Sequence, residues 1–400
     1  MSNNQNADHD IVITGLGIIT ANGVGLELNL ETFNRTNSRT SQADYRVVDF
    51  NPAPYLTDRK VVKVVSHRDV LGLVAFEECV RNSGLTSKSI DPNRTGLYVG
   101  APPSSCVDHH NYEEGIIASR DRSGVLQEEN FGENFASASP TTLLTGLPNN
   151  VLCYGAKTLD ARGPNSNYTT LETSAHMAII GASRAIRLNR LDCAIAGGYT
   201  AHSDKVFAAA MKHRSAGKVE TPIAEGAAFT TLETRKNAKA RGAKIICRIL
   251  GCAAASDAAG PYKSDTKTPA LIALMQQTMA GAGVLATDIE VIMTTGQGEM
   301  AVHESELNAI AAVWTAANKP ILATTVARWG NLMEAGGIGE IGFLDACYQL
   351  KSMPKASIIE CEKTVATKPK IFDASRTHAI ILRTTTWGEY TCLLVKMGSL

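Results

Sequence analysis

Residues 163–176 read Gly163-Pro164-Asn165-Ser166-Asn167-Tyr168-Thr169-Thr170-Leu171-Glu172-Thr173-Ser174-Ala175-His176. The stretch predicts a short polar strand, a sharp turn, and then a helix. The helix continues to Leu188 with many alanines and isoleucines, which is typical of a buried helix. A strand over 193–196 and a turn at Gly197-Gly198 follow. We therefore expect Glu172 to lie at a tight strand-to-helix turn inside an α/β protein.

The rest of the chain repeats this alternation of short apolar runs and helical patterns. Strands are predicted at 11–17 and 96–100, with a helix at 66–84 that ends at a glycine. Two further strands, 227–232 and 245–250, are predicted to pair with each other around a charged helix at 233–241. A second round of strands and helices runs from 268 to 383. The order predicts two similar βαβ-rich lobes, residues 1–250 and 251–400, packed face to face.

Size and composition are consistent with this division. Four hundred residues exceed what one hydrophobic core usually serves. Lys plus Arg and Asp plus Glu number 39 each, and no basic run indicates a nucleic-acid surface. No apolar run has the length of a signal peptide or a membrane span, so we expect a cytoplasmic protein. The nine cysteines are scattered without a CxxC pair, and neither a metal nor a cofactor is expected.

Three segments resemble the reaction centre of β-ketoacyl synthases (ketosynthases). The family has its nucleophilic cysteine where this chain has Glu172. In Ile292-Met293-Thr294-Thr295-Gly296-Gln297, Thr295 stands at the position of a catalytic histidine. In the run from Thr324 to Gly337, Val326 replaces the family's lysine and Asn331 its second histidine. The resemblance covers residues 10 to about 385 and implies a thiolase-like fold, layered α/β/α/β/α.

The same resemblance implies that this chain has no condensing activity. Loss of a catalytic nucleophile alone costs on the order of a millionfold in rate. Neither threonine nor asparagine titrates near neutral pH, so neither can transfer protons as histidine does. We therefore predict no catalytic residue at the four degenerate positions Glu172, Thr295, Val326 and Asn331.

Three interpretations of Glu172 remain open at the level of sequence. Glu172 could support decarboxylation of a malonyl thioester, by analogy with family members that carry glutamine there. Glu172 and His176 are one helical turn apart and could form an acid–base pair. The third interpretation is structural: the carboxylate fills the vacated pocket and accepts N–H bonds at the helix start.

A ketosynthase-like chain without its reaction centre resembles chain-length factors of type II polyketide systems, including those that make aryl polyenes. The resemblance implies a heterodimer with a catalytic ketosynthase, and contact with an acyl carrier protein through that complex. It places the interface along residues 165–170, with Asn167 and Thr169 as candidates. It makes Cys106, Val107 and His110 candidates for the end of an acyl tunnel. The segment 108–114 looks metal-binding at first sight, but it is interpreted as a polar loop or helix start.

Three alternatives to a chain-length factor remain open at the level of sequence. The lone chain could decarboxylate or hydrolyse thioesters through Glu172. It could be a homodimeric scaffold that binds carrier proteins without a catalytic mate. It could also stabilise a ketosynthase without setting the length of the product.

Overall fold

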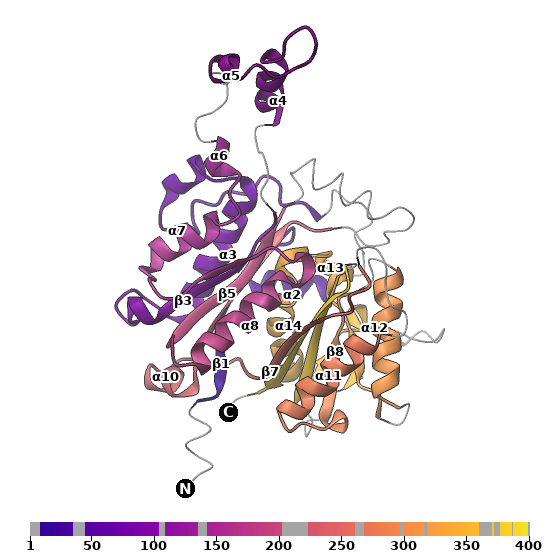
Figure 1. Cartoon of the computed structure of the whole chain (residues 1–400). Coiled ribbons are helices and arrows are strands. Elements are labelled where there is room, and N and C mark those ends of the chain that lie inside the picture. The colour runs from indigo at the N-terminus through magenta and orange to yellow at the C-terminus, as the bar shows by residue number, and fades with distance from the viewer. Residues whose placement is uncertain are drawn as a thin grey trace.

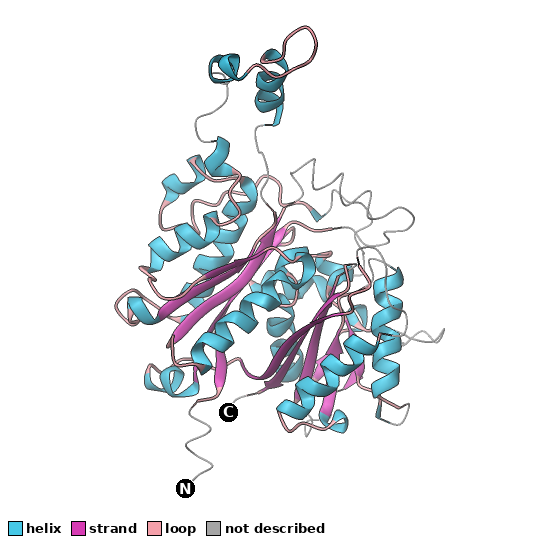
Figure 2. Cartoon of the chain, in the orientation of Figure 1, coloured by secondary structure: helices cyan, strands magenta, loops and turns pink. Residues whose placement is uncertain are grey.

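The computed structural model describes residues 9–34, 45–103, 109–134, 142–201, 223–260, 268–296, 300–315, 318–359, 370–371, 377–385 and 387–398. Figure 1 shows two groups of strands in the body, with helices between and around them, and a helical pair standing away from it. Figure 2 shows the same alternation of helix and strand by colour. Within the described residues, no helix is both long and apolar enough to cross a membrane.

Eleven strands of the described chain form one mixed sheet, in the order β4-β3-β5-β6-β1-β7-β13-β12-β8-β9, with β2 paired to β1. The strands are β1 (Ile11–Thr20), β2 (Gly23–Val24), β3 (Thr95–Gly100), β4 (Ser166–Tyr168), β5 (Cys193–Thr200), β6 (Gly226–Thr234), β7 (Cys247–Ser256), β8 (Ile289–Met293), β9 (Ile321–Ala323), β12 (His378–Thr384) and β13 (Glu389–Met397). A separate pair consists of β10 (Ser352–Met353) and β11 (Lys370–Ile371).

The helices make three layers. Outer helices α3 (His67–Ser83) and α7 (Asn150–Leu159) cover the β3–β1 half, and α11 (Pro269–Gly281) and α12 (Met300–Val313) flank the β7–β9 half. Between the halves lie α8 (Ser174–Arg187) and α14 (Gly339–Leu350). The remaining helices are α2 (Leu26–Glu31), α4 (His109–Ala118), α5 (Glu128–Asn134), α6 (Thr142–Thr145), α10 (Arg235–Ala240) and α13 (Val326–Trp329). The predicted α/β/α/β/α layering is confirmed.

The central helix α8 fits between the half-sheets because its side chains are short. It contacts β3, β4 and β5 on one side and β7 and β13 on the other. At Gly181, a Cβ atom would lie 2.2 Å from the Tyr168 hydroxyl oxygen and 3.0 Å from the Tyr98 ring. Ala175, Ala178 and Ala182 join the largest apolar core. Close helix–sheet packing therefore follows directly from the alanine- and glycine-rich sequence.

Sequence-based prediction of the outer helix was accurate at both ends. Ser66 and Asp69 form a capping box at the start of α3, and Gly84 ends it with φ 69°. The predicted pairing of the 227–232 and 245–250 strands is wrong, because β6 and β7 each pair with β1, which lies between them. Residue 250 falls within β7, which pairs with both β1 and β13. The division into lobes 1–250 and 251–400 stays a prediction.

Candidate functional site

The strand-to-helix turn predicted around Glu172 is present. Strand β4 ends at Tyr168, a 3-10 turn spans Leu171–Thr173, and α8 begins at Ser174. Leu171 has φ 53°, a left-handed conformation that costs a non-glycine residue about 1–3 kcal/mol. The Thr170 N–H donates to the Ser174 hydroxyl oxygen at 2.8 Å. The turn thereby holds Glu172, 5% exposed, at the start of the central helix.

Arg383, at the end of β12, lies among the degenerate positions and is 1% exposed. Its Nε donates to the main-chain oxygen of Glu172 at 3.3 Å. Its two terminal nitrogens donate to the main-chain oxygen of Thr295 at 3.5 Å and to Asn331 Oδ1 at 3.2 Å. One guanidinium therefore contacts three of the four positions predicted from the sequence.

The fourth position, Val326, lies beside Gly296, the residue that follows Thr295. A Cβ atom on Gly296, which follows Thr295 and has φ 98°, would lie 2.6 Å from Val326 Cγ2. Val326 is 3% exposed at the start of α13. The four positions predicted from the sequence thus come together, although they are up to 159 positions apart in the chain, from Glu172 to Asn331.

Two buried glutamates bind the backbone and hydroxyl groups on this side of the centre. Glu306 Oε1 accepts from the Thr295 hydroxyl at 2.6 Å and from the Thr384 hydroxyl at 3.0 Å. Glu340 accepts from the Thr325 hydroxyl and the Gly337 N–H, each at 2.9 Å, and its Oε1 lies 4.0 Å from an Arg383 nitrogen. Burial raises the pKa of Glu306, while its hydrogen bonds and Arg383 oppose that shift. Thr295 is consequently a buried, hydrogen-bonded side chain.

Glu334 brings another carboxylate to the centre. It lies in the 3-10 turn Met333–Ala335, fully buried. Burial raises the pKa of Glu334 to about 7, and the negative charge of Glu172 adds to the shift while Arg68 opposes it. The centre therefore combines buried carboxylates with a buried arginine.

The structure contradicts an acid–base pair between Glu172 and His176. His176 Nδ1 lies 3.0 Å from the Thr391 hydroxyl oxygen, and Nε2 has no hydrogen-bond partner among the described residues. Nε2 faces Gly337, where a Cβ atom would be only 2.0 Å away. Burial, with a smaller contribution from Arg383, holds the pKa of His176 well below its ordinary value. A neutral, enclosed imidazole without an acidic partner has no proton-transfer role here.

The predicted interface residues lie at the edge of the sheet. Asn167 is on β4 and donates to the main-chain oxygen of Pro148 at 3.1 Å, while Thr169, just beyond, is exposed. The tunnel candidates Cys106 and Val107 lie outside the described residues, as does the side chain of His110 in the first turn of α4. Across the described residues, no group of three or more metal-ligating side chains is found.

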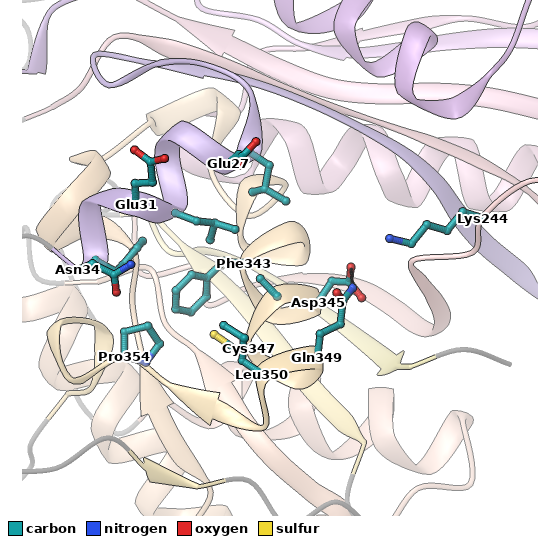
Figure 3. A pocket seen from close by; sticks show the side chains of 14 residues that line it. Glu27, Glu31, Asn34, Lys244, Phe343, Asp345, Cys347, Gln349, Leu350 and Pro354 are labelled. Carbon is teal, nitrogen blue, oxygen red and sulfur yellow. Dashed lines mark hydrogen bonds between the residues drawn. The ribbon is translucent and has the colours of Figure 1, made fainter.

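A pocket of about 510 Å³ lies elsewhere, between α2 and α14 (Figure 3). Phe343 and Leu30 give it an apolar wall, and Glu27, Asp345 and Lys244 contribute charge. Its lining includes none of the degenerate positions and neither Arg383 nor Glu334. This pocket is therefore separate from the reaction centre.

Sequence reasoning missed Arg383 and Glu334. A signal for Arg383 was available: a single charge ends the apolar run Ala379-Ile380-Ile381-Leu382, where a buried strand rarely carries one. Glu334 carries no comparable signal, because a lone acid in a loop between helices is usually solvated.

Comparisons with known proteins agree with this geometry. The model of the β-ketoacyl synthase N-terminal domain matches residues 31–222, and that of the C-terminal domain matches residues 246–355. The chain therefore belongs to the β-ketoacyl synthase family, and its thiolase-like fold is confirmed.

Individual relatives are distant. Nodulation protein E of Rhizobium meliloti is 26% identical over 64% of this chain and 63% of its own length. The 3-oxoacyl-[acyl-carrier-protein] synthase 1 of Haemophilus influenzae is 28% identical over 82% of this chain and 83% of its own. The chain thus spans less than two thirds of the nodulation protein that it matches.

Among solved structures, the ishigamide ketosynthase/chain length factor superposes with a TM-score of 0.80 and 20% identity, over 98% of this chain and 99% of that one. A β-ketoacyl synthase from Burkholderia phymatum gives 0.76 and 18%, over 98% and 100%. At these identities the similarity establishes the fold.

Proposed function

We propose that this chain is a non-catalytic partner of an active β-ketoacyl synthase, a chain-length factor of a type II polyketide system such as those making aryl polyenes. It pairs with the ketosynthase, stabilises it and bounds its acyl tunnel, and it meets the acyl carrier protein through that complex. The observation that best supports this proposal is the centre in which Arg383 donates hydrogen bonds to Glu172, Thr295 and Asn331. The thiol and imidazoles that condensation uses are replaced there by carboxylates and an arginine.

The edge of the sheet supports pairing with another chain. In the described chain β4 ends the strand order and pairs only with β3. An edge strand presents unpaired N–H and C=O groups that another strand can complete. Because β4 leads directly into the turn at Glu172, a partner added there lies next to the former reaction centre.

A helical arm, residues 109–134, supports the same proposal. Figure 1 shows α4 and α5 standing away from the body. Between residues 113 and 134 only Gly115 and Ser119 are buried, whereas Ile117 is 60% and Val125 58% exposed. Short helices that bury no apolar side chain are marginal in water. A partner surface would supply the burial that the arm lacks.

The ends of the arm are fixed beside β4. Arg68, 4% exposed, donates to the main-chain oxygen of Pro103 at 3.0 Å and to that of Gly146 at 3.2 Å. The main-chain oxygen of Pro148 accepts from Asn167 at 3.1 Å and from the Tyr199 hydroxyl at 2.9 Å. The arm therefore starts and returns next to the edge strand, where a partner would dock.

Co-expression with a catalytically active β-ketoacyl synthase tests the proposal. We expect a stable one-to-one complex that makes polyketide, and no condensation by this chain alone. Thr169→Pro removes an N–H at the exposed edge and should weaken the complex. The matched control is Thr169→Ala, which changes the same exposed side chain but keeps the N–H. A chain that condenses acyl and malonyl units unaided would overturn the proposal.

Three measurements separate the rivals. Malonyl-carrier turnover by the lone chain that disappears in Glu172→Ala would favour the decarboxylase. A soluble homodimer that binds carrier protein but no ketosynthase would favour the scaffold. Enlarging Val107 to Trp tests length control, and unchanged product lengths would leave a partner that only stabilises the ketosynthase.

A further inference from the structure

Arg383 lies directly against the turn at Glu172. Its guanidinium spans the main-chain oxygens of Glu172 and Thr295 and the side chain of Asn331. Three segments from different parts of the chain thus converge on one planar cation. A guanidinium suits this place because its five N–H donors fan out in a fixed fork.

The packing around the guanidinium is tight. At Gly336, a Cβ atom would lie 2.3 Å from one terminal nitrogen of Arg383 and 2.4 Å from Cζ. Arg383 is 1% exposed, and Glu172 and Thr295 are 5% exposed each. Even a methyl group therefore has no room on the Gly336 side, and the turn is withdrawn from solvent.

The buried charges keep the arginine in place. Glu340 lies 4.0 Å from its Nη1, and the charge of Arg383 also acts on Glu306. Removing a buried ion from such a group leaves its partners uncompensated, which is strongly unfavourable. A rotation of Arg383 out of the centre would carry the same penalty.

We propose that Arg383 is a built-in plug that blocks acyl thioesters and other electrophiles from the turn at Glu172. Replacing Glu172 by cysteine then does not restore a reactive nucleophile, because access as well as the thiol has been lost. The plug is independent of the pairing proposed above: a chain could pair with a ketosynthase whether or not its own turn is open.

The test restores a thiol and then removes the plug. The variants are Glu172→Cys alone, Glu172→Cys with Arg383→Ser, and Glu172→Cys with Arg383→Met. Both double variants keep the net charge of the chain but lose the cation beside Glu340, so the methionine variant controls for that loss and the serine variant adds only the cavity. Methionine keeps most of the volume of arginine, whereas serine opens a cavity. Iodoacetamide is the probe: the thiolate forms an S–C bond, the C–I bond breaks, and iodide leaves.

Alkylation is followed residue by residue by mass spectrometry, with the exposed Cys153 as internal reference. We expect Cys at position 172 to react at least about tenfold more slowly than Cys153 in the single variant and in the methionine variant, and at a comparable rate in the serine variant. Rates are compared from about pH 7 to about pH 10, because a neighbouring arginine lowers a thiol pKa and burial raises it. A difference in alkylation rate that is caused by access persists at high pH, where both thiols are deprotonated.

The single variant alone can overturn the proposal, since it keeps every other side chain. Fast alkylation there would show an open turn. Equal, slow rates in the serine and methionine variants would show that something other than Arg383 closes it. A chain that pairs with a ketosynthase yet is alkylated quickly would keep the proposed function and exclude the plug.

Discussion

The centre around Arg383 and the arm of residues 109–134 use their side chains in opposite ways. The centre buries charge: Arg383, Glu334 and Glu340 are each at most 3% exposed. The arm exposes apolar groups: Ile117 and Val125 are more than half exposed, and no apolar side chain is buried between residues 113 and 134.

The centre shows which charged groups the chain pairs within itself, and the arm shows which apolar groups it leaves exposed. In the centre, two hydrogen bonds and the nearby charge of Arg383 compensate the buried Glu340 within one chain. The arm carries six acidic residues and two arginines and has no core of its own. Its exposed apolar groups are available to the partner proposed above. We interpret the first region as the closed counterpart of the family's reaction centre and the second as the proposed site of association.

The largest effect is expected from Arg383→Met. Without the cation, Glu340 and Glu306 remain buried and uncompensated, and the free energy of unfolding should fall by about 3–5 kcal/mol. Denaturant unfolding of the isolated chain measures it. Arg122→Met, on the exposed arm, is the control and should change stability by less than about 0.5 kcal/mol.

A double-mutant cycle sharpens this result. Adding Glu340→Gln to Arg383→Met should recover part of the loss, because the two residues interact directly. Additive losses would mean that the pair does not stabilise the centre, and the contrast with the arm would weaken.

The next largest effect is on the pH dependence of the free energy of unfolding. Glu334 has a folded-state pKa raised to about 7, above the 4.5 of a free glutamate, so the folded protein holds its proton longer than the unfolded one. Its contribution is therefore most favourable below about pH 4.5 and is lost as the pH rises through 7. Glu334→Gln removes this loss. We expect the variant to match the parent at low pH and to be more stable by roughly 1–3 kcal/mol above neutrality.

Unfolding curves across this pH range check the result. Glu78, whose pKa burial also raises to about 7, is unchanged in both proteins and cancels in the difference. A difference between parent and variant that does not depend on pH would contradict the assignment.

On the arm, Ile117→Asp and Val125→Asp should leave the unfolding free energy of the isolated chain within about 0.5 kcal/mol. Affinity for the co-expressed ketosynthase should fall about tenfold or more, because the substitution places a charge in a buried apolar contact. Leu188→Asp, 54% exposed at the end of α8, is the matched control. Unchanged affinity would remove the arm from the interface.

The smallest free energy is expected for local opening of the arm. Its amides should exchange with solvent at nearly the unfolded rate in the isolated chain, while those of α8 stay protected. Protection of the arm on adding the ketosynthase would place it at the interface. Protection in the isolated chain would show that the arm is stable by itself.

Several elements were predictable because their signals are local. The ends of α3 follow from Ser66, Asp69 and Gly84, and the turn before Glu172 follows from residues 163–176. The β6–β7 pairing was mispredicted because strands close in sequence were taken as neighbours in space, whereas β1 separates them. Arg383 was missed because its partners lie 52 to 211 residues away.

By itself, the sequence determined the alternation of strands and helices and the turn at Glu172, and it indicated four positions that the fold brings together. These depend on periodicity, turn chemistry and residue type, all of which are local properties. Only the tertiary structure decided that Arg383 fills that centre, that His176 bonds to Thr391 and not to Glu172, and that the arm has no core. Each of these depends on which distant segments exclude water from a side chain, and that is settled only when the whole chain has packed.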